Sequence, residues 1–199
     1  MSAGQGSRVD PALWPEEFRE AVERMDAAAV RPEVAIESMP APQRIAPYAA
    51  ALSADVTAHG DELATGRIVL LHDPAGNDAW GGTFRCVVYA RAEIDREQAQ
   101  DPLVGEVAWS WIDEALTEHR ATAANPSGTV TVVSTESFGG MAEEEPTAQL
   151  EIRASWTPCD DVAGHVEAWA SLLCQAAGLE PVPAGVTLMP SRRGQRGSR

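Results

Sequence analysis

The stretch that decides the fold is GRIVLLHDPAGNDAWGGTFRCVVYARAEI, residues 66–94. It opens with a short apolar run, continues through turn-forming residues at 73–78, and from 83 to 94 alternates between inward apolar and outward positions. Alternation with a period of two is typical of a strand with one buried face. Asp, Pro, Gly and Asn are the residues that turns require. The stretch therefore predicts a β-hairpin at the centre of the fold.

Segments on either side of this hairpin add further strands and helices. Helical periodicity occurs at 15–29, 102–115 and 161–177, and extended patterns occur at 34–36, 48–57, 129–138 and 149–157. The Asn, Pro, Ser and Gly at 125–128 predict a turn. Strands in runs joined by short turns favour an antiparallel sheet over a doubly wound α/β fold. We predict an α+β fold: a single domain, residues 13–189, with an antiparallel sheet of about five to six strands and three helices mainly on one face. Residues 1–12 are predicted to be a disordered leader, and 190–199 a disordered Arg-rich tail.

The composition excludes several classes of partner. The net charge is −15, so the body of the protein repels nucleic-acid phosphates and anionic membranes at long range. No stretch approaches the roughly 18 apolar residues of a membrane span. Three cysteines without a CxxC pair suggest neither a disulfide framework nor a zinc site. We therefore expect a cytoplasmic protein that needs no cofactor or metal and binds neither nucleic acid nor membranes.

The outer face of the predicted sheet is rich in arginine. If the outward positions of the hairpin and the final strand share a face, three guanidinium groups gather beside a tyrosine, with a tryptophan in the adjoining loop. These residues are Arg85, Arg91, Arg153, Tyr89 and Trp80. Arginine binds carboxylate and phosphate through two parallel hydrogen bonds, so this face is the predicted site for a ligand or partner. The alternative is a structural ladder of Arg–Glu pairs that uses Glu93 and Glu151.

A second candidate site lies at the turn of the hairpin. His72 and Asp73 place an imidazole beside a carboxylate, which could serve as an acid–base pair in a small hydrolase or transferase. Arg153 or Arg85 would then hold an anionic substrate. The structural alternative is that Asp73 starts an Asx turn before Pro74. No serine or cysteine with a recognisable nucleophile motif accompanies the pair, so the structural interpretation is favoured.

Short motifs along the chain are shared with a known family. They are 42–48 (PQRIAPY), 70–76 (LLHDPAG), 80–85 (WGGTFR), 109–111 (WSW), 126–131 (PSGTVT), 138–140 (FGG), 151–158 (EIRASWTP) and 172–175 (LLCQ). In these motifs the chain, over about residues 14–189, resembles the actinobacterial family of uncharacterised proteins known as domain of unknown function 3000. The resemblance implies a bacterial, cytoplasmic protein and supplies no catalytic residues.

The order of elements also resembles that of the type III secretion chaperone-like fold, whose members are small, acidic and often dimeric. No sequence motif supports this second likeness, so it is an analogy of architecture alone. Together these observations favour a non-enzymatic binding or adaptor module. Its expected partner is an unidentified protein or small anionic ligand on the outer sheet face, and a homodimer is left open.

Overall fold

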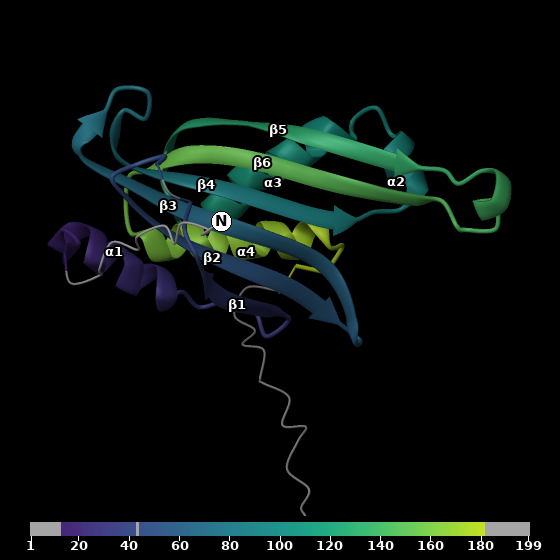
Figure 1. Ribbon diagram of the computed structural model, residues 1–199, viewed down its shortest axis with the longest axis horizontal. Coiled ribbons are helices and arrows are strands. Elements are labelled where there is room, and N and C mark those ends of the chain that lie inside the picture. The colour runs from purple at the N-terminus through teal and green to yellow at the C-terminus, as the bar shows by residue number, and fades with distance from the viewer. Residues whose placement is uncertain (1–12, 43, 182–199) are drawn as a thin grey trace, which may run out of the picture.

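The computed structural model describes residues 13–42 and 44–181; the predicted leader and Arg-rich tail lie outside this range. The described residues form the predicted α+β fold, with one six-stranded antiparallel sheet (Figure 1). The elements are α1 (Glu16–Asp26), β1 (Val34–Met39), β2 (Tyr48–Ala58), β3 (Asp61–Asn77), β4 (Gly82–Glu93), α2 (Arg96–Gln100), α3 (Val104–Glu118), β5 (Ala123–Thr135), the 3-10 helix η2 (Gly139–Met141), β6 (Thr147–Pro158) and α4 (Val162–Ala176).

The predicted hairpin is the centre of the sheet. The strand order is β1-β2-β3-β4-β6-β5, so β3 and β4 are the two middle strands. Their pairing includes Ala64 opposite Ala92 at one end and His72 opposite Phe84 near the turn. Alternation along β4 buries Val88 on the inner face and directs Tyr89 to the outer face. The period-two pattern in the sequence is therefore confirmed.

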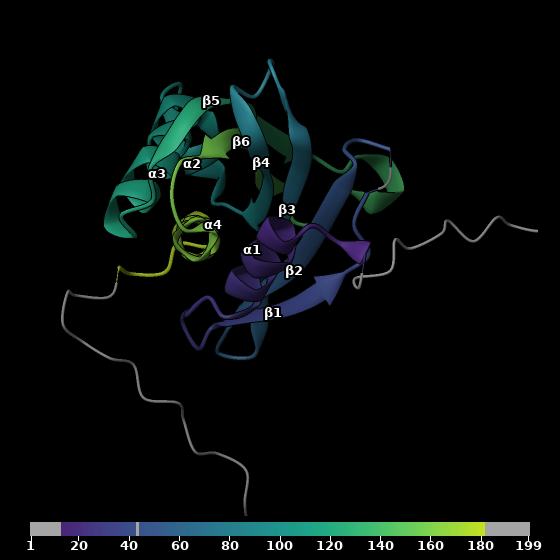
Figure 2. The same cartoon turned by 90° about the vertical axis from the view of Figure 1, so that its left-hand side faces the viewer.

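The three long helices cover the inner face of the sheet (Figure 2). Trp169 of α4 is fully buried, and its indole N–H donates to the carbonyl of Tyr89 in β4 at 3.2 Å. Phe18 of α1 and Ile112 of α3 join the same core. The side chain of Asp161 accepts a hydrogen bond from the first turn of α4 and caps that helix. In residues 13–42 and 44–181, no helix has the length and apolar character needed to cross a membrane.

Two glycines let the helical layer lie close to the strands. A Cβ atom on Gly66 in β3 would lie 2.6 Å from the carbonyl oxygen of Tyr89 and 2.7 Å from Cδ2 of Leu173 in α4. A Cβ atom on Gly128 in β5 would lie 2.9 Å from Cζ3 of Trp109 in α3. All three distances are too short for a side chain, so these glycines set how closely α3 and α4 approach the sheet.

A second apolar cluster covers one end of the outer face. Val69 and Leu71 are buried there with Ala51, beneath Trp80 and the segment that follows β1. Ile68 and Leu70, on the other side of the same strand, belong to the main core. The run 68–71 is therefore apolar at every position because both faces of β3 are covered at this point.

Three segments differ from the sequence prediction. Residues 73–77, expected in the turn of the hairpin, form the end of β3, where the register shifts between His72 and Asn77, and the turn itself is at 78–81. The expected turn at 125–128 lies inside β5, where the register shifts between Ala124 and Ser127. Pro126 has no N–H for the ladder and Asn125 has a φ of 52°, so this part of the strand bulges without reversing direction. The helix expected from residue 102 begins at Val104 as α3, after the separate short helix α2.

Candidate functional site

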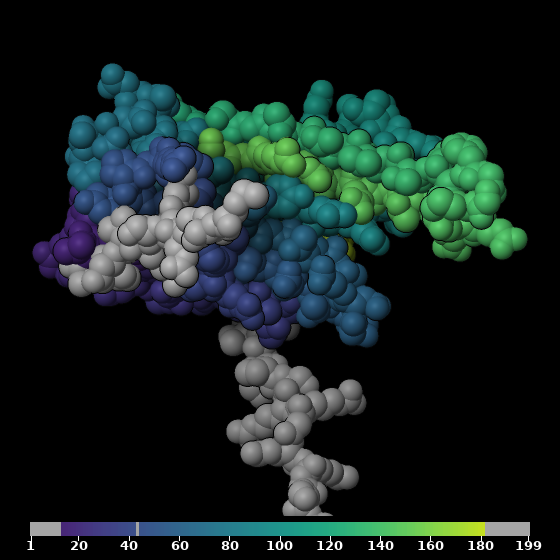
Figure 3. Space-filling model, in the orientation of Figure 1, coloured from purple at the N-terminus to yellow at the C-terminus, as the bar shows by residue number. Residues whose placement is uncertain are grey.

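The outer face of the sheet carries a shallow hollow of about 370 Å³. It lies where β3, β4, β6 and β5 run side by side, and in Figure 3 the surface recedes between the green of β6 and the blue strands below it. Its walls include Arg67, Val69, Val87, Tyr89, Arg153 and Ser155. Pockets that hold small molecules have volumes of roughly 300–1,000 Å³. The hollow is therefore the candidate binding site on this face.

Strand register places the two arginines of the hollow on either side of Tyr89. Arg67 is opposite Tyr89 in the β3–β4 pair, and Tyr89 is opposite Arg153 in the β4–β6 pair. The Cζ atoms of the two guanidinium groups lie 5.3 and 5.5 Å from the centroid of the tyrosine ring, which is cation–π distance. Partial burial and then the neighbouring Glu151 carboxylate raise the pKa of Tyr89. The ring stays neutral and holds both cations.

The hollow carries more positive than negative charge. Arg153 forms an ion pair of 3.0 Å with Glu151, and 65% of the Arg153 side chain is exposed. Within the part of the chain that the structure describes, no carboxylate forms an ion pair with Arg67. Arg91 is on the same face but outside the hollow, and its Nε donates to Gln149. The alternative interpretation expected a ladder of Arg–Glu pairs on this face. Among the described residues, Arg153–Glu151 is the one ion pair of that ladder.

Arg85 lies on the predicted face but is buried, with 7% of its surface exposed. One terminal nitrogen donates to Oγ1 of Thr157 at 3.1 Å. The other donates to Oγ of Ser155 at 2.8 Å, to the Ser155 carbonyl at 3.1 Å and to Oγ of Ser127 at 3.2 Å. All of these acceptors are neutral, and burial lowers the pKa of the Arg85 guanidinium. Because Ser127 and Ser155 also line the hollow, a buried positive charge lies directly beside it.

A chain of hydrogen bonds links Arg85 through Thr157 to the turn between β3 and β4. The carbonyl oxygen of Trp80, in the turn between β3 and β4, accepts hydrogen bonds from the hydroxyl of Thr157 and from the side-chain amide of Asn125 in the β5 bulge. The side chain of Trp80 packs against the second apolar cluster and not into the hollow. Trp80 is therefore linked to Arg85 through its backbone carbonyl and Thr157.

The second predicted pair, His72 and Asp73, is divided between the core and the surface. The imidazole of His72 is fully buried between the rings of Phe18 and Phe84, with centroids at 5.6 and 4.2 Å. Its Nδ1 is 3.1 Å from the Thr83 carbonyl. Its Nε2 is 3.0 Å from Oε1 of Glu17 but has no hydrogen-bond partner among the described residues.

The carboxylate of Asp73 has a local partner instead. It accepts a hydrogen bond from the backbone N–H of Ala75 at 3.1 Å, which is the Asx turn that the sequence allows. Consecutive residues of a strand point to opposite faces, so the imidazole and the carboxylate are directed apart. Neither residue lines the outer-face hollow.

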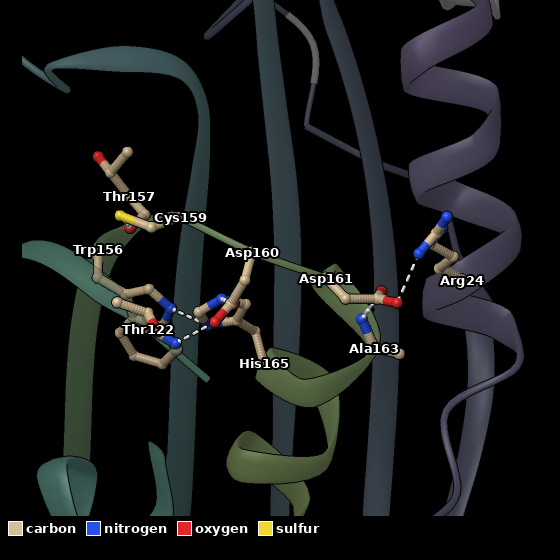
Figure 4. A network of polar contacts seen from close by, with 9 residues as sticks. All are labelled: Arg24, Thr122, Trp156, Thr157, Cys159, Asp160, Asp161, Ala163 and His165. Carbon is tan, nitrogen blue, oxygen red and sulfur yellow. Dashed lines mark hydrogen bonds and ion pairs between the residues drawn. The ribbon is translucent and has the colours of Figure 1, made fainter. Parts of the chain in front are cut away.

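A buried polar network that the sequence analysis did not single out joins β6 to α4 (Figure 4). The indole N–H of Trp156 donates to Nδ1 of His165 at 3.0 Å, and Nε2 of His165 lies 2.9 Å from Oδ1 of Asp160. Indole is only a donor, so Nδ1 accepts, and Nε2 carries the proton that is donated to Asp160. Both ring nitrogens are occupied, so His165 is placed as a structural group and not as a free base.

Burial and hydrogen bonding shift both ionisable members of this network. Burial lowers the pKa of His165, and the opposing effect of Asp160 is smaller. Partial burial alone would raise the pKa of Asp160, but the backbone N–H of Thr122 and the His165 contact together lower it. The pair therefore consists of a neutral imidazole and a carboxylate. In residues 13–42 and 44–181, no group of three or more His, Cys, Asp or Glu side chains could hold a metal ion.

Sequence reasoning missed Arg67 in the hollow and His165 in the network. For Arg67 a signal was present, because it stands one position before Ile68 in the quoted stretch and so on the outward side of that strand. The sequence does not give the strand register that places Arg67 opposite Tyr89. His165 is in α4 and Trp156 is in β6, and the chain between them includes the end of the strand and the cap of the helix. No periodic sequence pattern therefore connects the two residues.

Comparison with known proteins agrees with the resemblance in the sequence. No curated protein and no solved structure matches the chain, so the likeness to secretion chaperones remains a prediction from element order alone. A family model described as protein of unknown function (DUF3000) matches residues 14–187. That match covers most of the chain, and the protein belongs to this family.

Proposed function

We propose that the outer sheet face of this protein is a non-enzymatic binding or adaptor surface whose hollow receives a carboxylate or phosphate group. The observation that carries the proposal is the charge at the hollow: Arg67 and Arg153 flank Tyr89, and the hydrogen-bond partners of buried Arg85 in the described part of the chain are all neutral. A buried cation without a counter-ion is costly. An anion in the hollow would compensate for it.

The walls of the hollow indicate what the rest of the ligand is like. Val69 and Val87 supply apolar surface, and Tyr89 supplies an aromatic edge between the two guanidinium groups. Ser127 and Ser155 add hydroxyl groups at the side where Arg85 lies. A small ligand with an apolar or aromatic body and one anionic group satisfies all of these contacts. The acidic side chain of a partner protein presents the same chemistry.

In this proposal the protein acts in the cytoplasm. Its net charge of −15 disfavours nucleic acid and anionic membranes as partners. A partner protein would be basic overall and would present one carboxylate or phosphate to the hollow. The edge strand β5 is the candidate surface for a homodimer, and light scattering on the purified protein measures whether one forms.

The proposal is tested by calorimetric titration with phenyl phosphate and with benzoate, which combine an aromatic ring with one anionic group. We expect saturable binding of at least one of them to the wild type. Arg153→Gln removes a charge-assisted contact worth about 1.5–3 kcal/mol, so binding weakens by about 10- to 100-fold.

The matched control is Arg91→Gln, on the same sheet face but outside the hollow. This variant should bind the probes as the wild type does. The proposal fails if neither probe binds to the wild type. It also fails if the Arg91 and Arg153 variants are weakened equally, because the effect would then come from the general charge of the face.

A further inference from the structure

A second cavity, of about 660 Å³, lies on the helical side of the protein. It is bounded by α3, by α4 and by residues 29–32 after α1, and α3 and α4 lie side by side there (Figure 2). Its lining includes Trp111, Glu114, Glu118, His119, Ser171 and Gln175. This cavity is separate from the hollow on the outer sheet face and shares none of its residues.

The wall of this cavity contains a chain of three hydrogen-bonded side chains. Oγ of Ser171 is 2.7 Å from Nε2 of His119, and Nδ1 of the same imidazole is 3.3 Å from Oε2 of Glu167. A carboxylate accepts the proton on Nδ1, which leaves Nε2 as the acceptor of the serine hydroxyl. The order nucleophile, base and orienting carboxylate is that of the catalytic triads of acyl-transfer enzymes.

The positions of the three residues follow from the helices that carry them. Glu167 and Ser171 are four residues apart on α4 and so lie on the same side of that helix. His119 is the C-cap of α3. A Cβ atom on Gly164 would lie 3.2 Å from the carbonyl oxygen of His119, so a glycine at this place lets the end of α3 come close to α4.

The carboxylate of Glu167 is itself held in place by a hydrogen bond. Oε1 of Glu167 accepts a hydrogen bond from the backbone N–H of Ala29 at 3.0 Å, which leaves Oε2 directed at His119. The imidazole keeps 22% of its side-chain surface exposed. Ser171 and His119 both border the cavity, so the hydroxyl and its base are accessible to a molecule inside it.

We infer that Ser171 is a nucleophile for acyl transfer, with His119 as its general base and Glu167 as the group that orients the base. In the first step the Ser171 Oγ bonds to the carbonyl carbon of an ester while its proton passes to Nε2 of His119. The ester C–O bond then breaks, and the leaving alcohol takes that proton. Water next attacks the acyl-serine and gives a proton to His119. The carboxylic acid leaves, and Oγ recovers the proton.

The lining of the cavity sets the class of substrate. Arg31 also borders the cavity, but its guanidinium is paired with Glu33 at 3.0 Å. Glu114 and Glu118 add negative charge and Trp111 adds an aromatic surface, so a neutral or cationic ester is favoured over an anionic one. Gln175 lies four residues after Ser171 on α4, and its amide, which donates to Glu114 at 3.3 Å, also borders the cavity. That amide is the candidate donor to the oxyanion that forms during attack.

The inference is tested with a fluorophosphonate ester, which reacts with activated serines: the Oγ–P bond forms, the P–F bond breaks and fluoride leaves. Intact-mass spectrometry of the folded protein should show one adduct, and peptide mapping should place it on Ser171. The adduct should be absent from Ser171→Ala. His119→Gln should slow labelling by about 100-fold or more, the usual contribution of a general base. Glu167→Gln should slow it less.

Ser134→Ala is the matched control, because Ser134 is an exposed serine of β5 on another part of the molecule; its labelling should equal that of the wild type. Circular dichroism confirms that each variant is folded. Three results would overturn the inference: no adduct on the folded wild type, an adduct that survives Ser171→Ala, or a labelling rate that does not change in both His119→Gln and Glu167→Gln.

Discussion

The indole of Trp156 donates a hydrogen bond to the imidazole of His165 inside the core, and that bond exists only while His165 is neutral. A proton on Nδ1 would face the indole N–H donor-to-donor. The carboxylate of Asp160, on the other ring nitrogen, cannot relieve this clash because it contacts Nε2. The protonation state of one buried side chain is therefore coupled to the packing of β6 against α4.

This coupling predicts that the protein loses stability as the pH falls below neutrality. The pKa of His165 in the folded protein is lowered from its ordinary value of 6.5. Below about that pH the unfolded chain binds a proton that the folded chain resists, so the free energy of unfolding decreases and then levels off below the folded pKa. Urea unfolding between about pH 8 and pH 5 measures this slope.

The variant His165→Gln isolates the contribution of this residue. It lacks the titrating ring, so its free energy of unfolding should change less over the same pH range than that of the wild type. Equal slopes in the two proteins would show that His165 does not titrate differently in the folded and unfolded states.

Asp160 affects stability at lower pH than His165 does. Its pKa in the folded protein is lowered from the ordinary value of 3.8, so its contribution to the free energy of unfolding is present above about pH 3.8 and is lost below it.

A second prediction concerns the spacing between α4 and the sheet. Gly66→Ala places a methyl group 2.7 Å from Leu173 and 2.6 Å from the Tyr89 carbonyl, and overpacking of this kind costs about 1–3 kcal/mol. Gly105→Ala is the control, because a methyl group there meets nothing within 4 Å in the first turn of α3. It should be neutral or stabilise by about 0.5 kcal/mol. Thermal unfolding of the two variants compares them; a neutral Gly66→Ala would contradict the close approach.

A third prediction tests Tyr89 as the support for both arginines of the hollow. Tyr89→Ala removes two cation–π contacts, each worth about 0.5–1 kcal/mol, and frees Arg67 and Arg153 to move. Binding of phenyl phosphate should weaken by about 5- to 30-fold in the calorimetric titration. Tyr89→Phe keeps the face of the ring and should bind within about twofold of the wild type. If the Phe variant is as weak as the Ala variant, the hydroxyl and not the ring is what matters.

A fourth prediction concerns the rates at which the three cysteines react with a thiol reagent. Burial raises the pKa of Cys86 to about 12 and that of Cys174 to about 11, whereas Cys159 is exposed. Only the thiolate reacts rapidly with disulfide reagents. A thiol titration of the native protein near neutral pH should therefore detect one fast cysteine, and all three should react in urea. Cys159→Ser should remove the fast reaction; a second fast thiol in the native protein would contradict the burial of the other two.

The centre of the fold could be predicted because its signal is local. Alternation in 83–94 and the turn residues at 73–78 define a hairpin without any knowledge of distant parts of the chain. The bulge at Asn125 and Pro126 was mistaken for a turn because the same residues suit both. Only the pairing of β5 with β6 on both sides of it distinguishes the two.

The outer-face site could be predicted only in part. Tyr89 and Arg153 were expected there, and both line the hollow. The environment of Arg85 could not be expected, because its hydrogen bonds lead through Thr157 to Trp80, and these two residues are 77 residues apart in the chain. His119 and Ser171 are likewise 52 residues apart. Such contacts are products of tertiary packing, and a single sequence contains no periodic signal for them.

The position of α4 has a consequence for biosynthesis. This helix packs against β2, β3, β4 and β6 as well as α1 and α3, yet it is the last helix along the described chain. While the ribosome is still making residues 162–176, the inner face of the sheet has no cover at its middle. The nascent chain therefore exposes apolar surface until α4 has been made, and holding chaperones should bind the chain before that point.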